Sequence, residues 1–209
     1  MAKQIFQNLL FTSCLLISIT SSGQKDPPFI VDSTVSTIVD ENIKLTDFPA
    51  SSTMKSTMTI NDTTFAENYG FGKNLGAVTQ ASLRHDTIFI TSFLMAREAT
   101  FGYKIILTRD SCTIKYFSLA DEDIFKINKA DKPSHLISFI CQTNKLTFSR
   151  RPQFKIGELI EGVVELATND FWSYNKGQNT KVKVKLTGYF KTKLSQFRPN
   201  EEGVFKQIQ

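Results

Sequence analysis

The chain holds few of the side chains that bind metals or attack substrates. Its two histidines, His85 and His135, and two of its three cysteines, Cys112 and Cys141, are the candidates for a metal site or a nucleophile–base pair. Neither Cys-x-x-Cys nor His-Glu-x-x-His occurs, and His85 lies in a turn-like segment between two predicted strands. We therefore expect structural roles for these residues and assign neither a metal nor a cofactor.

Carboxylates offer another route to catalysis. A glycosidase needs two of them roughly 5–10 Å apart across a cleft, and the candidates here are Glu158, Glu161, Glu165 and Asp170. Glu161 and Glu165, however, fall on the solvent face of a predicted strand. The sequence also lacks Gly-x-Ser-x-Gly and a glycine-rich phosphate loop. A hydrolase is therefore the least favoured function, and no catalytic residue is assigned.

Three aromatic residues form the best candidate contact surface: Phe171, Trp172 and Tyr174. They follow the turn-like residues 168–170 and precede the polar segment 175–179, which predicts a loop between two strands. Aromatic side chains on such a loop stack on sugar rings or fill a partner's pocket. The alternative is that Trp172 folds back and closes one end of the domain.

The N-terminus has the pattern of a signal peptide. Lys3 gives a positive start, residues 9–19 are apolar, and Ser21 and Gly23 are the small residues that a signal peptidase prefers. The apolar run is shorter than the roughly 20 residues that span a bilayer. We predict cleavage near Gly23/Gln24 and export to the periplasm, the cell surface or the medium, with no transmembrane span after cleavage. A buried N-terminal helix is the alternative.

Export limits the partners and the state of the cysteines. Cleavage leaves 186 of the 209 residues and lowers the net charge from +5 to +4, because the removed segment holds one Lys and no acid. We expect no nucleic acid partner; a cell-envelope polymer, a glycan or another exported protein is the expected class. In an oxidising compartment, Cys112 and Cys141 either form a disulfide or stay as buried thiols in neighbouring strands.

Short apolar stretches separated by polar turns predict an all-β protein. Eighteen Phe residues dominate the aromatic content, and Phe suits half-buried strands. Alternation over residues 54–60 predicts one strand. Three further pairs predict hairpins, namely 77–83 with 87–95, 101–107 with 112–119, and 136–142 with 146–149. This spacing is typical of an antiparallel β-sandwich, with a small β-barrel as the alternative.

The chain divides into four predicted parts. These are a signal peptide (1–23), a flexible or late-docking segment (24–50), an antiparallel β domain (51–195) and a C-terminal tail (196–209). We expect one short helix at most. Its candidate is the stretch 121–128, because acidic residues open it.

Residues 159–166 and 181–186 predict the clearest strand pair, because apolar and charged residues alternate in both. Antiparallel pairing would join the apolar faces to the core. It would also place Glu161 and Glu165 in water against three lysines, Lys181, Lys183 and Lys185. Together with Lys191 and Lys193, these lysines form an anion-binding stripe in the alternative, less favoured interpretation.

Residues 154–166 resemble a sequence pattern common in β-sandwich domains, arrestin-like domains included; they read Phe-Lys-Ile-Gly-Glu-Leu-Ile-Glu-Gly-Val-Val-Glu-Leu. In that pattern two glycines flank a strand, and Ile156 occupies a position that is often proline. The fuller pattern is a signal peptide, short strands and a Lys-rich strand that ends in Gly188-Tyr189-Phe190. It resembles small uncharacterised exported proteins of Gram-negative bacteria. Both resemblances imply an all-β fold, and neither brings a catalytic or binding residue.

Export, an all-β fold and the lack of catalytic motifs together predict a non-catalytic binding or envelope-associated protein. Its contacts would come from the aromatic residues at 171–174 or from an exposed strand edge. A β-barrel carrier of a small apolar ligand is the alternative, because abundant Phe suits a lined cavity as well as a filled core.

Overall fold

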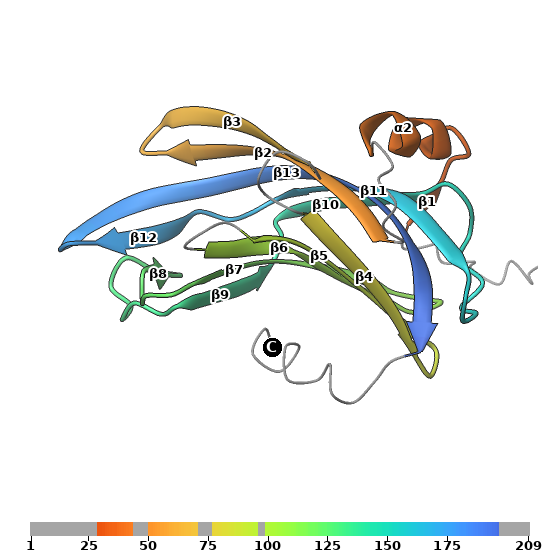
Figure 1. Cartoon of the computed structure of the whole chain (residues 1–209). Helices are drawn as coiled ribbons and strands as arrows, with labels where there is room; N and C mark the ends of the chain where they lie inside the picture. Colours follow the sequence, from red (N-terminus) through yellow and green to blue (C-terminus); the bar gives the residue numbers. More distant parts are fainter. Residues whose placement is uncertain (1–28, 44–49, 71–76, 96–98, 197–209) are drawn as a thin grey trace, which may run out of the picture.

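The computed structural model describes residues 29–43, 50–70, 77–95 and 99–196. The predicted signal peptide and nearly all of the predicted C-terminal tail lie outside the described residues. The described residues form mostly β-strands with a single short α-helix, which confirms the all-β fold class (Figure 1).

In chain order the elements are β1 (Ile30–Val31), α2 (Val35–Asn42), β2 (Ala50–Ile60), β3 (Thr63–Gly70), β4 (Ala77–Arg84), β5 (Thr87–Met95), β6 (Ala99–Leu107), β7 (Cys112–Ala120), β8 (Phe125–Lys126), β9 (Leu136–Ile140), β10 (Thr143–Phe148), β11 (Leu159–Ala167), β12 (Phe171–Asn175) and β13 (Gln178–Gln196).

The strands of the described residues form one curled, mixed sheet with the shape of a half-barrel (Figure 1). Its main path runs β1-β10-β11-β13-β4-β5-β6-β7-β9. Most neighbours are antiparallel, but β1 runs parallel to β10 and β4 runs parallel to β13. The prediction of a wholly antiparallel sheet is therefore wrong at these two places, and a sandwich of two separate sheets is not confirmed.

Strand β13 joins the two halves of the half-barrel. It is 19 residues long, against the five or six residues of an ordinary strand. It pairs with β12 through residues 178–182, with β11 through 185–193, with β2 through 182–192, and with β4 through 194–196. The first three neighbours belong to one half, and β4 begins the other.

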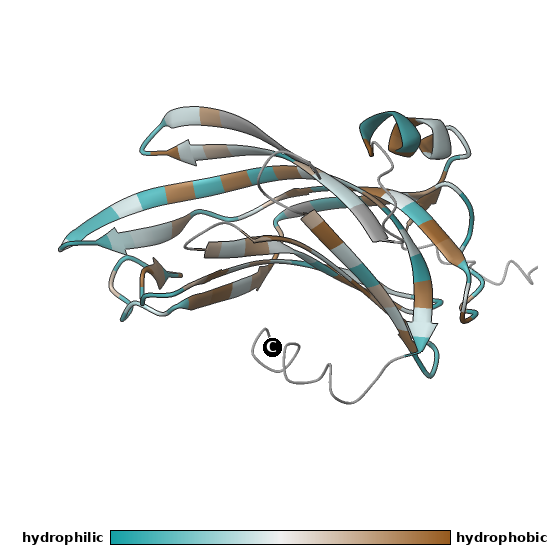
Figure 2. Ribbon diagram, in the orientation of Figure 1, coloured by the Kyte–Doolittle hydropathy of each residue, from teal (hydrophilic) through white to brown (hydrophobic). Residues whose placement is uncertain are grey.

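The sequence alternation of β13 sets its orientation. Val182, Val184, Leu186 and Phe190 are buried, whereas the lysines between them face outward. Figure 2 shows the resulting alternation of apolar and polar positions along the strand. The predicted direction of the apolar face is confirmed, and so is the antiparallel pairing of β11 with β13.

Two of the predicted hairpins are confirmed, since β4 pairs with β5 and β6 pairs with β7. Two more hairpins, β2–β3 and β12–β13, turn through two residues each. Asn61 and Asp62 have φ of 44° and 67°, and Lys176 and Gly177 have φ of 46° and 84°. Two successive positive φ angles are the mark of a type I′ turn, whose twist matches that of the paired strands.

The third predicted hairpin is wrong. Strand β9 pairs with β7, whereas β10 pairs with β11. Between them, Cys141 N–H donates to Ile114 O at 3.3 Å and Gln142 N–H donates to Ala167 O at 2.9 Å. The chain thus crosses from one half of the sheet to the other at this point. A hydrophobic pattern reports which face of a strand is buried, but it does not report the neighbouring strand.

The only helix in the described ranges is not the expected one. Residues 121–128 form bends and the short strand β8, whereas α2 lies in the segment 24–50, which showed no clear periodicity. Helix α2 packs on the outer face of the sheet. It does so through the buried residues Val35 and Val39, together with Ile43 just after the helix, which contact Val163 and Tyr189. Their spacing of four residues is helical, but the stripe is too narrow to stand out in so short a segment.

A contact across the interior fixes the distance between the two halves. Tyr103 of β6 is fully buried, and its ring lies over Gly188 of β13. A Cβ atom built on Gly188 would stand 2.4 Å from Cε1 of Tyr103. The ring therefore needs a residue without a side chain at position 188.

We predict that Gly188→Ala lowers the free energy of unfolding by about 1–3 kcal/mol, because the new methyl group displaces a buried ring. Denaturant unfolding followed by circular dichroism measures this loss. The control is Thr187→Ala on the outer face, for which we expect a change below about 1 kcal/mol. Equal losses for both variants would contradict the close contact.

Candidate functional site

The three aromatic residues of the predicted contact surface lie on strand β12 and not on a loop. Phe171 pairs with Val182 and points inward, where it is 3 % exposed. Its ring centroid lies 5.8 Å from that of Phe139, 6.2 Å from Tyr116 and 6.4 Å from Phe125. Phe171 is therefore a core residue, and it drops out of the contact surface.

Trp172 and Tyr174 lie on the opposite, outer face of β12, because successive strand residues alternate. Both rings are half-buried, and each has a lysine ammonium over it. Lys126 Nζ lies 4.5 Å from the centroid of the Tyr174 ring, and Lys129 Nζ lies 5.4 Å from that of Trp172. Two cation–π pairs thus stand side by side on one strand.

The segment that carries these lysines is held close to β12. Lys126 is the register partner of Trp172 in the β8–β12 pair. Tyr174 N–H donates to Ile124 O at 2.6 Å, and Lys126 Nζ donates to Lys129 O at 3.4 Å. The lysines are therefore placed over the rings by the backbone of β8 and the turn after it.

More lysines continue this surface along β13. Lys181 pairs with Trp172 across the β12–β13 ladder, so it projects from the same face. Lys183 and Lys185 follow at alternate positions of the strand. We call this surface the basic–aromatic face. Its members are Trp172, Tyr174, Lys126, Lys129, Lys181, Lys183 and Lys185.

One carboxylate partly offsets the charge of the basic–aromatic face. Asp170 Oδ2 lies 2.5 Å from Lys181 Nζ, and both side chains are well exposed. The hydrogen bond from Lys181 to Asp170 raises the pKa of the ammonium, and the charges of Asp170 and Asp62 add to that effect. The ion pair with Asp170 thus holds Lys181 in place. Within the described residues, the other four lysines of the basic–aromatic face form no ion pair.

The predicted pairing of charges between β11 and β13 is shifted along the strand. Glu161 pairs with Lys191, not with Lys181–Lys185, and its carboxylate lies 3.1 Å from Lys191 Nζ. Asp40 of α2 lies 2.9 Å from the same ammonium. Hydrogen bonds to Asp40 and Glu161 raise the pKa of Lys191. Strand β13 extends beyond the predicted residues 181–190, and its far end places Lys191 opposite Glu161.

The carboxylates considered for hydrolysis have separate partners. Glu158 accepts hydrogen bonds from the Gln153 N–H at 3.0 Å with both oxygens, while Glu161 and Asp170 form the ion pairs described above. Glu165 is exposed and lies opposite Lys145 in the β10–β11 ladder. Each of these four carboxylates therefore has a partner or register neighbour of its own.

Cys112 and Cys141 are both free, so the disulfide alternative is not confirmed. Cys141 is buried in the core, and Cys112 is half-buried against it. Burial raises the pKa of each thiol to about 11. Such thiols are poor nucleophiles at neutral pH, which agrees with a packing role.

The histidines also stand apart from one another. His85 occupies the β4–β5 turn with φ of 52°, and His135 Nδ1 lies 3.3 Å from Asp123 Oδ1 in an exposed pair. Within the described residues, no group of three or more His, Cys, Asp or Glu side chains is placed to hold a metal ion.

Comparisons with known proteins returned no match: no family model, no curated protein and no solved structure matches this chain. The resemblance to small exported proteins of Gram-negative bacteria therefore stays a prediction. In the described part of the chain, no helix has the length and apolar character needed to cross a membrane.

Neighbouring residues of β12 should respond differently to truncation. We predict that Phe171→Ala lowers the free energy of unfolding by about 3–5 kcal/mol, because it opens a cavity among buried rings. Trp172→Ala should cost less than about 2 kcal/mol, because its ring is only partly removed from water. Chemical denaturation of both variants measures the difference. A larger loss for Trp172→Ala would place that ring in the core instead.

Proposed function

We propose that this protein is an exported, non-catalytic binding protein that holds an acidic glycan of the cell envelope on its basic–aromatic face. One observation carries the proposal: the paired ammonium groups over the rings of Trp172 and Tyr174. Aromatic rings on an open strand face suit the flat faces of sugars, and lysines suit their acidic groups.

The lysines over the rings favour an acidic sugar over a neutral one. A neutral sugar that stacks on Trp172 must displace the ammonium of Lys129, which forfeits about 0.5–1 kcal/mol of cation–π attraction at an exposed site. A uronic acid sugar displaces it equally but gives the ammonium a carboxylate partner. The same reasoning applies to Lys126 and Tyr174.

The shape of the face suits an extended polymer. Lys181, Lys183 and Lys185 repeat at every second residue of β13, which spaces them by roughly 7 Å. The row of lysines begins at Lys181, which lies beside its register partner Trp172. A chain of acidic sugars can therefore contact the rings at one end and the lysine row along its length.

A carrier of an apolar ligand is the alternative, and it would need room inside the half-barrel. Large buried side chains occupy that interior, Tyr103, Tyr116, Phe148 and Phe190 among them. The ring of Tyr103 also packs directly on Gly188 of the facing half, which leaves no space between the halves at that point. These observations support a surface function over a cavity function.

The proposal predicts selective binding of polygalacturonate over the neutral polymer dextran. Replacing both face lysines, Lys126→Gln with Lys129→Gln, should weaken binding by about tenfold, and Trp172→Ala by a similar factor. Affinity electrophoresis or calorimetry with the exported protein measures both effects. Binding should also weaken as salt is raised, because the lysines are exposed.

The matched control is Lys193→Gln, which removes an exposed lysine from the outer face at the opposite end of β13. It should change the affinity by less than about twofold. Equal losses of affinity in the control and in the face variants would show that binding depends only on the net charge of the protein. Failure of polygalacturonate to bind the wild-type protein would reject the proposal, and a protein partner captured through Trp172 would replace it.

A further inference from the structure

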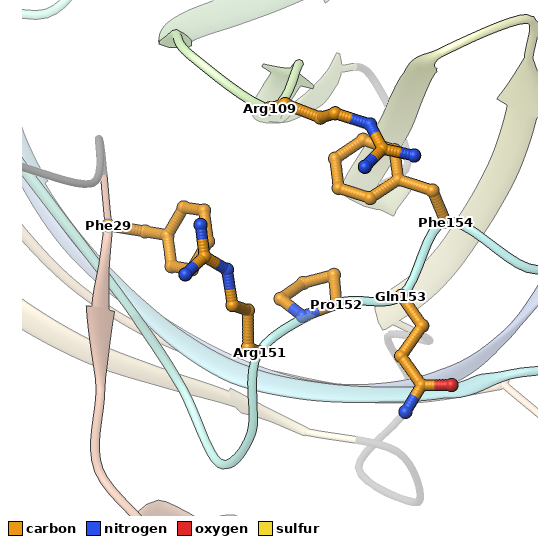
Figure 3. A pocket seen from close by; sticks show the side chains of 6 residues that line it. All are labelled: Phe29, Arg109, Arg151, Pro152, Gln153 and Phe154. Atoms are coloured by element: carbon orange, nitrogen blue, oxygen red, sulfur yellow. The ribbon is translucent and has the colours of Figure 1, made fainter. Parts of the chain in front are cut away.

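A cavity of about 210 Å³ lies far from the basic–aromatic face. Its lining residues come from three segments: Phe29 before β1, Arg109 in the β6–β7 turn, and the stretch Arg151, Pro152, Gln153 and Phe154 after β10 (Figure 3). Figure 1 shows β1 and the β12–β13 hairpin at opposite ends of the half-barrel. None of the lining residues is a member of the basic–aromatic face.

We propose that this cavity is a binding site for a small carboxylate with a flat apolar body, of about the size of benzoate. Two arginines line it, and no carboxylate does. Phe29, Pro152 and Phe154 supply apolar walls, and the Gln153 amide adds a neutral polar group. The cavity therefore combines positive charge at its edge with flat apolar surface.

One of the two arginines stacks on an aromatic wall of the cavity. The guanidinium carbon of Arg109 lies 5.6 Å from the centroid of the Phe154 ring. Stacking of this kind uses the face of the guanidinium, whereas its N–H groups point outward in the plane. In Figure 3 the guanidinium groups of Arg109 and Arg151 approach the cavity from opposite sides of Pro152.

The aromatic walls are fixed before any ligand arrives. Phe29 packs edge-on against Phe148 at 5.3 Å and is 5 % exposed. Phe154 has φ of 58°, which is rare and costly for a large side chain. The neighbouring Gln153 N–H is held by both carboxylate oxygens of Glu158. This strained, well-tethered loop keeps the Phe154 ring beneath Arg109.

The volume decides the size of the ligand. An apolar cavity of roughly 150 Å³ holds one benzene molecule. The present cavity is larger by about the volume of two waters, which leaves room for a carboxylate beside the ring. A bare ion would leave the apolar walls uncovered.

Titration of the full exported protein with benzoate, followed by amide NMR shifts, tests the site. We expect a dissociation constant of the order of 1–10 mM or tighter, with amide shifts centred on Arg109, Arg151, Gln153 and Phe154. Benzyl alcohol lacks the charge and acetate lacks the ring, so each should bind at least about fivefold more weakly. Binding of acetate or inorganic phosphate as tight as that of benzoate would overturn the choice of ligand class.

Matched variants separate this site from general charge effects. Arg109→Gln and Arg151→Gln should each weaken benzoate binding by about tenfold, whereas Lys155→Gln, in the same loop but outside the cavity, should not. Equal effects of all three, or no effect of either arginine, would overturn the proposal. Trp172→Ala should leave benzoate binding unchanged, so this test and that of the glycan-binding proposal can fail independently.

Discussion

The structure depends on a single long strand whose side chains must suit two halves of the sheet at once. Strand β13 pairs with β12, β11, β2 and β4. Its inward residues therefore run through the interior from one half of the sheet to the other. At Gly188 the strand has no side chain, and Tyr103 fills that space from the facing half. The same alternation that buries Val182 and Phe190 leaves the lysines outside. Core packing and surface charge are therefore two consequences of one pattern.

That pattern explains how the proposed binding surface lies on a strand and not on a loop. Once Phe171 is committed to the aromatic core, Trp172 must point outward, because successive residues of a strand face opposite ways. Strand β8 and the turn that follows it then place lysines over the half-buried rings. The lysines partly shield the rings from water, and the rings in turn hold the ammonium groups in place.

Local features of the fold could be predicted from the sequence, whereas long-range pairings could not. Alternating residues and polar turns predicted the β4–β5 and β6–β7 hairpins, as well as the inward face of Val182 and Val184. The partner of β9 and the register of Glu161 with Lys191 depend on contacts distant in sequence, so no local signal reports them. Trp172 and Tyr174 were predicted as contact residues, but Lys126 and Lys129 were not, because only the β8–β12 pairing brings them together.

Intrinsic fluorescence is the most direct test of the central claim, because Trp172 is the only tryptophan in the chain. Its emission therefore reports the basic–aromatic face without any label. We expect a saturable change in intensity or wavelength when oligogalacturonate is added, none with a neutral oligosaccharide of equal length, and loss of the change at high salt. Binding of oligogalacturonate that leaves the emission of Trp172 unaltered would show that the basic–aromatic face is not the binding site.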